Sequence, residues 1–144
     1  MVLAIGSDHG GYELKEFLKS ILIESGYEVK DFGCYSQDSV DYPDIAISLC
    51  KELQKGSFDR GILICGTGIG MSITANRFKG IRATLCNDLF SAKMSRRHNN
   101  SNLLCLGGRI IGKDLAKEIL NIWLTEPFDG DRHLRRINKI DDEI

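Results

Sequence analysis

Cys65 is the residue of this chain whose position most directly suggests chemistry. It closes an apolar run, Gly61–Cys65, and stands just before a glycine-rich loop and a predicted helix. A free thiol has a pKa of about 8.5, and the start of a helix can lower that value and favour a reactive thiolate. Cysteines without such neighbours are more often small buried apolar residues. We expect that plain role for Cys50, Cys86 and Cys105, and we treat Cys34 as a loop residue.

The loop after Cys65 carries three alternating glycines, Gly66, Gly68 and Gly70, with Thr67 and Ile69 between them. Glycines let backbone N–H groups turn inward and approach an anion, and a following helix adds partial positive charge. A tight turn explains one or two glycines but less easily three, so the pattern predicts an anion-binding loop. Position 71 is a methionine, where a dinucleotide fingerprint needs glycine and a tyrosine phosphatase needs arginine, and no Walker Gly-Lys-Ser/Thr follows.

Groups that titrate near neutral pH follow two other predicted elements. Asp8-His9 comes directly after the first apolar run, and His98 ends a predicted helix. A single histidine is more often structural, but two of only three histidines at such ends favour a functional role. Neither an H-x-x-x-H pattern nor a pair of nearby cysteines is present, so we expect no metal site.

Arginines supply candidate phosphate ligands. Arg132 and Arg136 are four residues apart and would share one helix face, and guanidinium forks suit phosphate. Several aspartates nearby also fit a solvated charged tail, and the pattern does not decide between the two. Arg109, just after Gly107-Gly108, is a further candidate.

Alternating apolar patterns predict the elements that position these residues. Short runs at 2–5, 27–32, 61–65, 82–86 and 103–106 read as strands, and between and after them lie helical stripes at 14–22, 42–53, 73–78, 88–97, 115–123 and 132–140. The alternation predicts an α/β fold: a three-layer α/β/α sandwich with a doubly wound, Rossmann-like, five-stranded parallel sheet and a C-terminal helix, in a single domain over residues 1–144. Ligands bind beyond the carboxyl ends of such strands. The fold therefore brings Asp8 and Cys65 together, whereas it does not force His98 to join them.

Composition excludes several classes of protein. The net charge of −1 argues against a dedicated nucleic-acid or membrane-surface protein. No apolar run approaches the ~20 residues of a membrane span, and the first residues lack the pattern of a signal peptide. Five widely spaced cysteines favour free thiols, and hence a cytoplasmic location.

At these residues the chain resembles the B-type ribose-5-phosphate isomerases of the ribose/galactose isomerase family. The resemblance covers nearly the whole chain in order. It is carried by Gly6-Ser7-Asp8-His9-Gly10-Gly11, Asp41-Tyr42-Pro43, the run from Gly61 to Gly70, Gly80-Ile81-Arg82-Ala83, Ser95-Arg96-Arg97-His98-Asn99, Gly108-Arg109, and Arg132 with Arg136.

The resemblance implies cofactor-free interconversion of ribose 5-phosphate and ribulose 5-phosphate, by a homodimer or dimer of dimers with active sites between subunits. It implies that Cys65 moves a proton between carbons 1 and 2, and that His98, reaching in from the partner subunit, opens the furanose ring with help from Asp8 or Thr67. Residues expected to contact the sugar, the enediolate or the phosphate are Asp8, His9, Tyr42, Gly66, Thr67, Gly68, Ile69, Gly70, Asn99, Arg109, Arg132 and Arg136.

One branch of the family lacks the cysteine and uses a glutamate where this chain has Met71, so the resemblance places the chain in the cysteine branch. The galactose-6-phosphate isomerase subunits are more distant, since they generally lack signatures that are intact here. Three alternatives stay open at this point. They are an isomerase of a six-carbon sugar phosphate such as allose 6-phosphate, a non-catalytic phosphate- or nucleotide-binding module, and a redox-sensing thiol protein.

Overall fold

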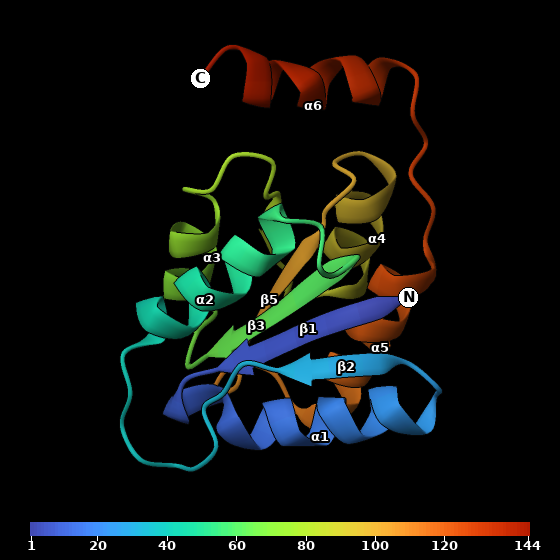
Figure 1. Cartoon of the computed structure of the whole chain (residues 1–144). Helices are drawn as coiled ribbons and strands as arrows, with labels where there is room; N and C mark the ends of the chain where they lie inside the picture. The colour runs from blue at the N-terminus through green and yellow to red at the C-terminus, as the bar shows by residue number, and fades with distance from the viewer.

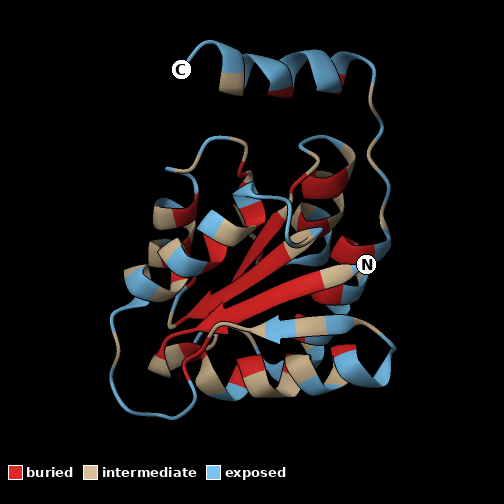
Figure 2. Cartoon of the chain, viewed as in Figure 1, coloured by how far each residue is buried: buried red, intermediate tan, exposed pale blue.

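Five short strands form one parallel sheet in the computed structural model, which describes residues 1–144 (Figure 1). The strands are β1 (Val2–Ser7), β2 (Glu28–Asp31), β3 (Arg60–Cys65), β4 (Ala83–Leu85) and β5 (Leu103–Gly107). Their order is β2-β1-β3-β5-β4, and every pairing is parallel. Figure 2 shows β1, β3 and β5 buried almost throughout. Burial on both faces explains why these strands read as continuous apolar runs rather than as alternating patterns.

Helices cover both faces of the sheet. They are α1 (Tyr12–Glu24), α2 (Tyr42–Gln54), α3 (Ile69–Ala75), α4 (Leu89–Arg97), α5 (Lys113–Thr125) and α6 (Arg132–Asp142), with a 3-10 turn, η1, at His9–Gly11. One core joins the sheet to α1, α4 and α5, where Leu18 and Trp123 are fully buried. The other joins it to α2 and α3 through Leu49 and Met71. The predicted three-layer α/β/α fold is confirmed.

Some element ends differ from the sequence pattern. Phe78 lies beyond α3, which ends at Ala75, because the Asn76 side chain bonds both the N–H and the C=O of Ala83 and so ties the chain to the start of β4. Cys34 lies in a loop as expected, but it is buried, with 6% exposed. The buried ammonium of Lys15 donates to the Cys34 carbonyl at 2.7 Å and holds this loop against α1.

The sheet has its switch point between β1 and β3. The chain leaves β1 toward β2 on one side, and β3 pairs with β1 on the other. At the carboxyl end of this pair the N–H of Asp8 donates to the carbonyl of Ile64 at 3.2 Å, so the loops after the two strands are adjacent. A crevice at this place is where open α/β sheets bind ligands.

The last helix, α6, lies apart from the layered body at the end of an extended connection (Figure 1). Two of its contacts with the body involve named polar side chains. His133 stacks on His98, and the Asp141 carboxylate accepts the N–H of Gly80 at 3.1 Å. None of the helices has the length and apolar character needed to cross a membrane.

Candidate active site

The sulfur of Cys65 lies at the carboxyl end of β3 and accepts a hydrogen bond from the Gly68 N–H at 3.1 Å. Gly68 has a φ of +81°, and a Cβ there would lie 2.5 Å from Cδ1 of Leu85 and 2.9 Å from the backbone carbon of Leu106. Only glycine fits this backbone, and this backbone aims an amide at the sulfur.

The rest of the loop is flanked by two side chains that the sequence singled out. The Arg109 guanidinium lies over Gly66, where an added Cβ would be 3.4 Å from Nη1. The Tyr42 ring lies on Gly70, where a Cβ would be 2.6 Å from the ring. The hydroxyl of Thr67 accepts the N–H of Ile69 at 3.2 Å. The glycines therefore serve close packing against the protein itself.

Asp8 and His9 join the same edge of the sheet. The Asp8 carboxylate is 7% exposed and caps η1, because its Oδ1 accepts the N–H groups of Gly10 at 2.9 Å and Gly11 at 3.2 Å. The Nδ1 of His9 accepts the N–H of Val40 at 3.3 Å. A neutral His9 must then carry its proton on Nε2. His9 and Arg109 line a hollow of about 340 Å³.

His98 and Asn99 do not lie at this edge. They follow α4, and the Asn99 carbonyl accepts the Arg82 Nε–H at 3.0 Å just before β4 begins. All strands are parallel, so the start of β4 marks the opposite edge from Cys65. At this amino edge a second hollow, of about 420 Å³, is lined by His98, Asn99, Arg132 and Arg136.

His133, which the sequence suggested only as a neighbour of Arg132, belongs to this second group. Its ring stacks on that of His98, with centroids 4.2 Å apart and planes 9° apart, and it is 7% exposed. Burial lowers the pKa of His133, and the positive charges of His98, Arg132 and Arg136 act in the same direction. The sequence signal that could have indicated the burial of His133 is its spacing of four from Ile137, the other buried residue of α6.

His98, His133 and Asp129 also gather three groups of the kind that hold metals, with ligand atoms within 4.8 Å of one another. A bound metal lies near the plane of each ligating imidazole. Two rings stacked in parallel planes do not direct their lone pairs at one ion. Asp129 is also paired with Arg97, at 3.1 Å from Nε to Oδ1. The arrangement fits a stacked and charge-paired cluster better than a metal centre.

One chain thus carries two groups of candidate residues at opposite edges of its sheet, and we call each group a half-site. The carboxyl-edge half-site holds Asp8, His9, Tyr42, Cys65, Gly66, Thr67, Gly68, Ile69, Gly70 and Arg109. The amino-edge half-site holds His98, Asn99, Arg132, His133 and Arg136. The sequence predicted nearly all of these residues, but one chain does not bring the two sets together.

The model of a family described as Ribose/Galactose Isomerase matches residues 3–140. The chain belongs to this family. The resemblance stated from the sequence motifs is confirmed, and this family member is an isomerase rather than a non-catalytic module.

Relatives of this isomerase match it over nearly their full lengths. Ribose-5-phosphate isomerase B of Escherichia coli is 45% identical over 138 residues, covering 96% of this chain and 93% of that protein. A solved ribose-5-phosphate isomerase B of Clostridium thermocellum is 49% identical with a TM-score of 0.98, covering 99% of this chain and 97% of the other. A D-erythrulose-4-phosphate isomerase of Pectobacterium atrosepticum is 42% identical, covering 96% of this chain and 91% of that protein.

Proposed function

We propose that this isomerase interconverts ribose 5-phosphate and ribulose 5-phosphate through an enediolate, without a cofactor. The observation that carries the proposal is the Cys65 sulfur, which lies at the switch point of the sheet and accepts the Gly68 N–H. Aldose–ketose isomerisation needs a base that takes a proton from carbon 2 and returns it to carbon 1. A thiolate held at this place provides that base.

The loop after Cys65 supports the second requirement, which is stabilisation of the enediolate. Backbone N–H groups of this loop would donate to the substrate oxygens on which negative charge develops. The amides of Gly68 and Ile69 already donate to Cys65 and Thr67, so those of Gly66, Thr67 and Gly70 are the available donors. Donors of this kind contribute about 3–4 kcal/mol each in other enzymes. The Thr67 hydroxyl and the Asp8 carboxylate lie beside them and would contact the sugar hydroxyls.

Phosphate recognition and ring opening draw on the charged groups of both half-sites. In the carboxyl-edge half-site, His9 presents Nε2–H and Arg109 a guanidinium to one hollow. In the amino-edge half-site, Arg132 and Arg136 flank His98 and Asn99. His98 would open the furanose ring by proton transfer, Asn99 would hold the substrate, and the arginines would bind its phosphate.

A second copy of the chain would complete the site, because the two half-sites cannot meet within one sheet. Apolar side chains next to each half-site are exposed: Ile69 and Ile73 on α3, and Leu134 and Ile140 on α6, each between 47% and 57%. Exposed apolar groups of this kind favour an interface. We therefore propose a homodimer, or a dimer of dimers, in which each active site takes one half-site from each of two subunits.

The substrate is tested by turnover of ribose 5-phosphate with purified protein in the presence of EDTA. Allose 6-phosphate and erythrulose 4-phosphate are assayed beside it, the latter because of the four-carbon substrate in the name of one relative. We expect the highest kcat/KM on ribose 5-phosphate. A higher value on the four- or six-carbon sugar would move the proposal to that substrate. A complete loss of activity with EDTA would overturn the cofactor-free mechanism.

A further inference from the structure

Three guanidinium groups converge at the amino edge of the sheet, outside both half-sites. Arg60 begins β3, Arg82 lies just before β4, and Arg96 lies near the end of α4. With Asn100 and Asn102 they line a hollow of about 600 Å³. Of the three, Arg96 is buried, with only 5% of the residue exposed.

The positive charge of this hollow is poorly balanced. Neither Arg60 nor Arg96 makes a salt bridge, and the Nη1 of Arg82 is 4.0 Å from the Asp141 carboxylate. One carboxylate, that of Asp59, lines the hollow, and its Oδ2 already accepts the N–H of Val2 at 2.6 Å. The chain as a whole has a net charge of −1, so the excess is local.

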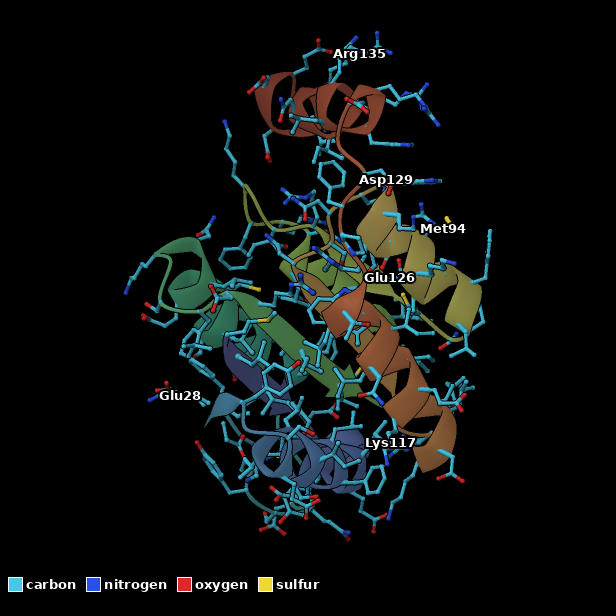
Figure 3. The ribbon with its side chains drawn as sticks, turned by 90° about the vertical axis from the view of Figure 1, so that its right-hand side faces the viewer. Glu28, Met94, Lys117, Glu126, Asp129 and Arg135 are labelled. Atoms are coloured by element: carbon cyan, nitrogen blue, oxygen red, sulfur yellow. The ribbon has the colours of Figure 1, made fainter.

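Backbone carbonyls satisfy part of each guanidinium. Arg60 donates from Nη1 to the Trp123 carbonyl at 2.6 Å, and Arg82 donates from Nη2 to the Asn100 carbonyl at 3.1 Å. Arg96 donates from Nε to the Glu126 carbonyl at 3.4 Å. Figure 3 faces this side of the molecule and labels Glu126 where the chain leaves α5. The bonds from Arg60 and Arg96 cap the C-terminal end of α5, where cations are favourable, and the bond from Arg82 holds the loop that follows α4.

Capping leaves donors free. The Nη2 groups of Arg60 and Arg96 donate to no acceptor of the protein. Every buried side-chain nitrogen has a hydrogen-bond partner, so these two unpartnered groups must be in contact with solvent. Burial lowers the pKa of Arg96 to about 10, and the charges of Arg60 and Arg82 act in the same direction. Burial also lowers the pKa of Arg60. All three remain charged at neutral pH and repel one another.

We propose that this arginine hollow is a binding site for a small polyanion that carries phosphate or carboxylate groups. Guanidinium forks recognise both groups by paired hydrogen bonds, and the amide of Asn100 adds a neutral partner on the same wall. A bound anion would balance the three charges and take up the free Nη2 donors. The site is separate from the proposed substrate phosphate ligands, which are Arg109 at the other edge and Arg132 and Arg136 on α6.

The fluorescence of Trp123 offers a direct test. It is the only tryptophan, and the guanidinium carbon of Arg60 lies 5.3 Å from its ring centroid. Wild-type protein is titrated with pyrophosphate and, separately, with citrate, at constant ionic strength set with sodium chloride. We expect a saturable change and one calorimetric site per chain that persists in the double variant Arg132→Gln, Arg136→Gln. Saturation with only one of the two anions would assign the ligand class.

Variants then assign the site. Arg82→Gln and Arg60→Met should weaken binding at least tenfold, whereas Arg135→Gln, an exposed arginine on α6 outside the hollow, should not change it. Thermal unfolding midpoints show which variants remain folded. If Arg60→Met or Arg82→Gln does not fold, Arg60→Lys or Arg82→Lys replaces it in the binding measurement. Absence of saturation with both anions in the wild type would overturn the proposal. So would loss of the site in the Arg132, Arg136 double variant, or equal weakening in Arg135→Gln. None of these outcomes depends on which sugar phosphate the enzyme isomerises.

Discussion

The imidazole of His133 lies flat against that of His98, with 4.2 Å between ring centroids and 9° between ring planes. The contact joins the first turn of α6 to the residue that follows α4. His98 therefore cannot rotate freely toward α6. The same contact carries a cost in acid, because two imidazoles in van der Waals contact repel when both are protonated.

This stack predicts a pH-dependent stability. The pKa of His133 is lowered by burial and by the charges of His98, Arg132 and Arg136. The unfolded chain takes up a proton at this residue near pH ~6.5, and the folded chain does so only at lower pH. The free energy of unfolding should therefore fall as the pH drops from about 7 toward the lowered pKa. Urea unfolding at pH 7.5 and pH 5.5 measures the loss, which we expect to be smaller in His133→Leu. An unchanged pH dependence in that variant would contradict the assignment.

The assignment of Cys65 as base predicts a loss of turnover without a loss of binding. Cys65→Ala should lower kcat by at least about 10³-fold, which corresponds to about 4 kcal/mol of transition-state stabilisation, while ribose 5-phosphate still binds. Cys50→Ala is the matched control, because burial raises the pKa of that thiol to about 12 and leaves it inert. Turnover of Cys65→Ala near the wild-type value would remove Cys65 from the base role.

The separation of the half-sites predicts complementation between two inactive variants. Cys65→Ala and His98→Asn each remove one half-site from every composite site. In a mixed dimer, one site carries both changes and the other carries neither. Unfolding and refolding an equimolar mixture should therefore restore about one quarter of the wild-type activity, because about half of the dimers are mixed. Failure to recover any activity from correctly assembled mixed dimers would show that each chain works with its own residues.

Gly68 should be intolerant of any side chain. Alanine there would require a positive φ and would place a Cβ 2.5 Å from Leu85 and within 3.0 Å of the Leu106 backbone. We expect Gly68→Ala to cost about 1–3 kcal/mol of stability and to displace the amide that bonds Cys65, so that kcat falls in the fraction that stays folded. Gly56→Ala is the comparison, since Gly56 also has a positive φ (+80°) but open space around it. Equal activities in the two variants would indicate that the amide does not matter.

The sequence was a good guide to the fold and named the candidate site residues, but it was a poor guide to their arrangement. Apolar runs and helical stripes predicted every strand and long helix, because burial imposes those periods locally. Asp8 and Cys65 could be brought together because Asp8 follows one parallel strand and Cys65 ends another. His98 follows a helix that runs back across the sheet, so a residue rich in chemistry ends at the opposite edge.

Contacts between distant segments left no local signal. The spacing of His133 from Ile137 indicated a buried helix face, but only the structure showed its ring against that of His98. Arg60, Arg82 and Arg96 come from three separate parts of the chain, and no spacing relates them. Such clusters depend on how loops and helix ends pack at an edge, which the periodicity of single elements does not encode.

Because Cys65 and His98 lie at opposite edges of the sheet, the activity of the protein should depend on its concentration. A strand of six residues spans about 20 Å and is too rigid to fold back on itself, so a lone chain has no conformation that unites the two residues. With composite sites, specific activity would depend on protein concentration and would fall toward zero below the dissociation constant of the dimer. The reaction rate would then scale with the square of the subunit concentration in dilute solution. Unpaired chains would contribute no activity.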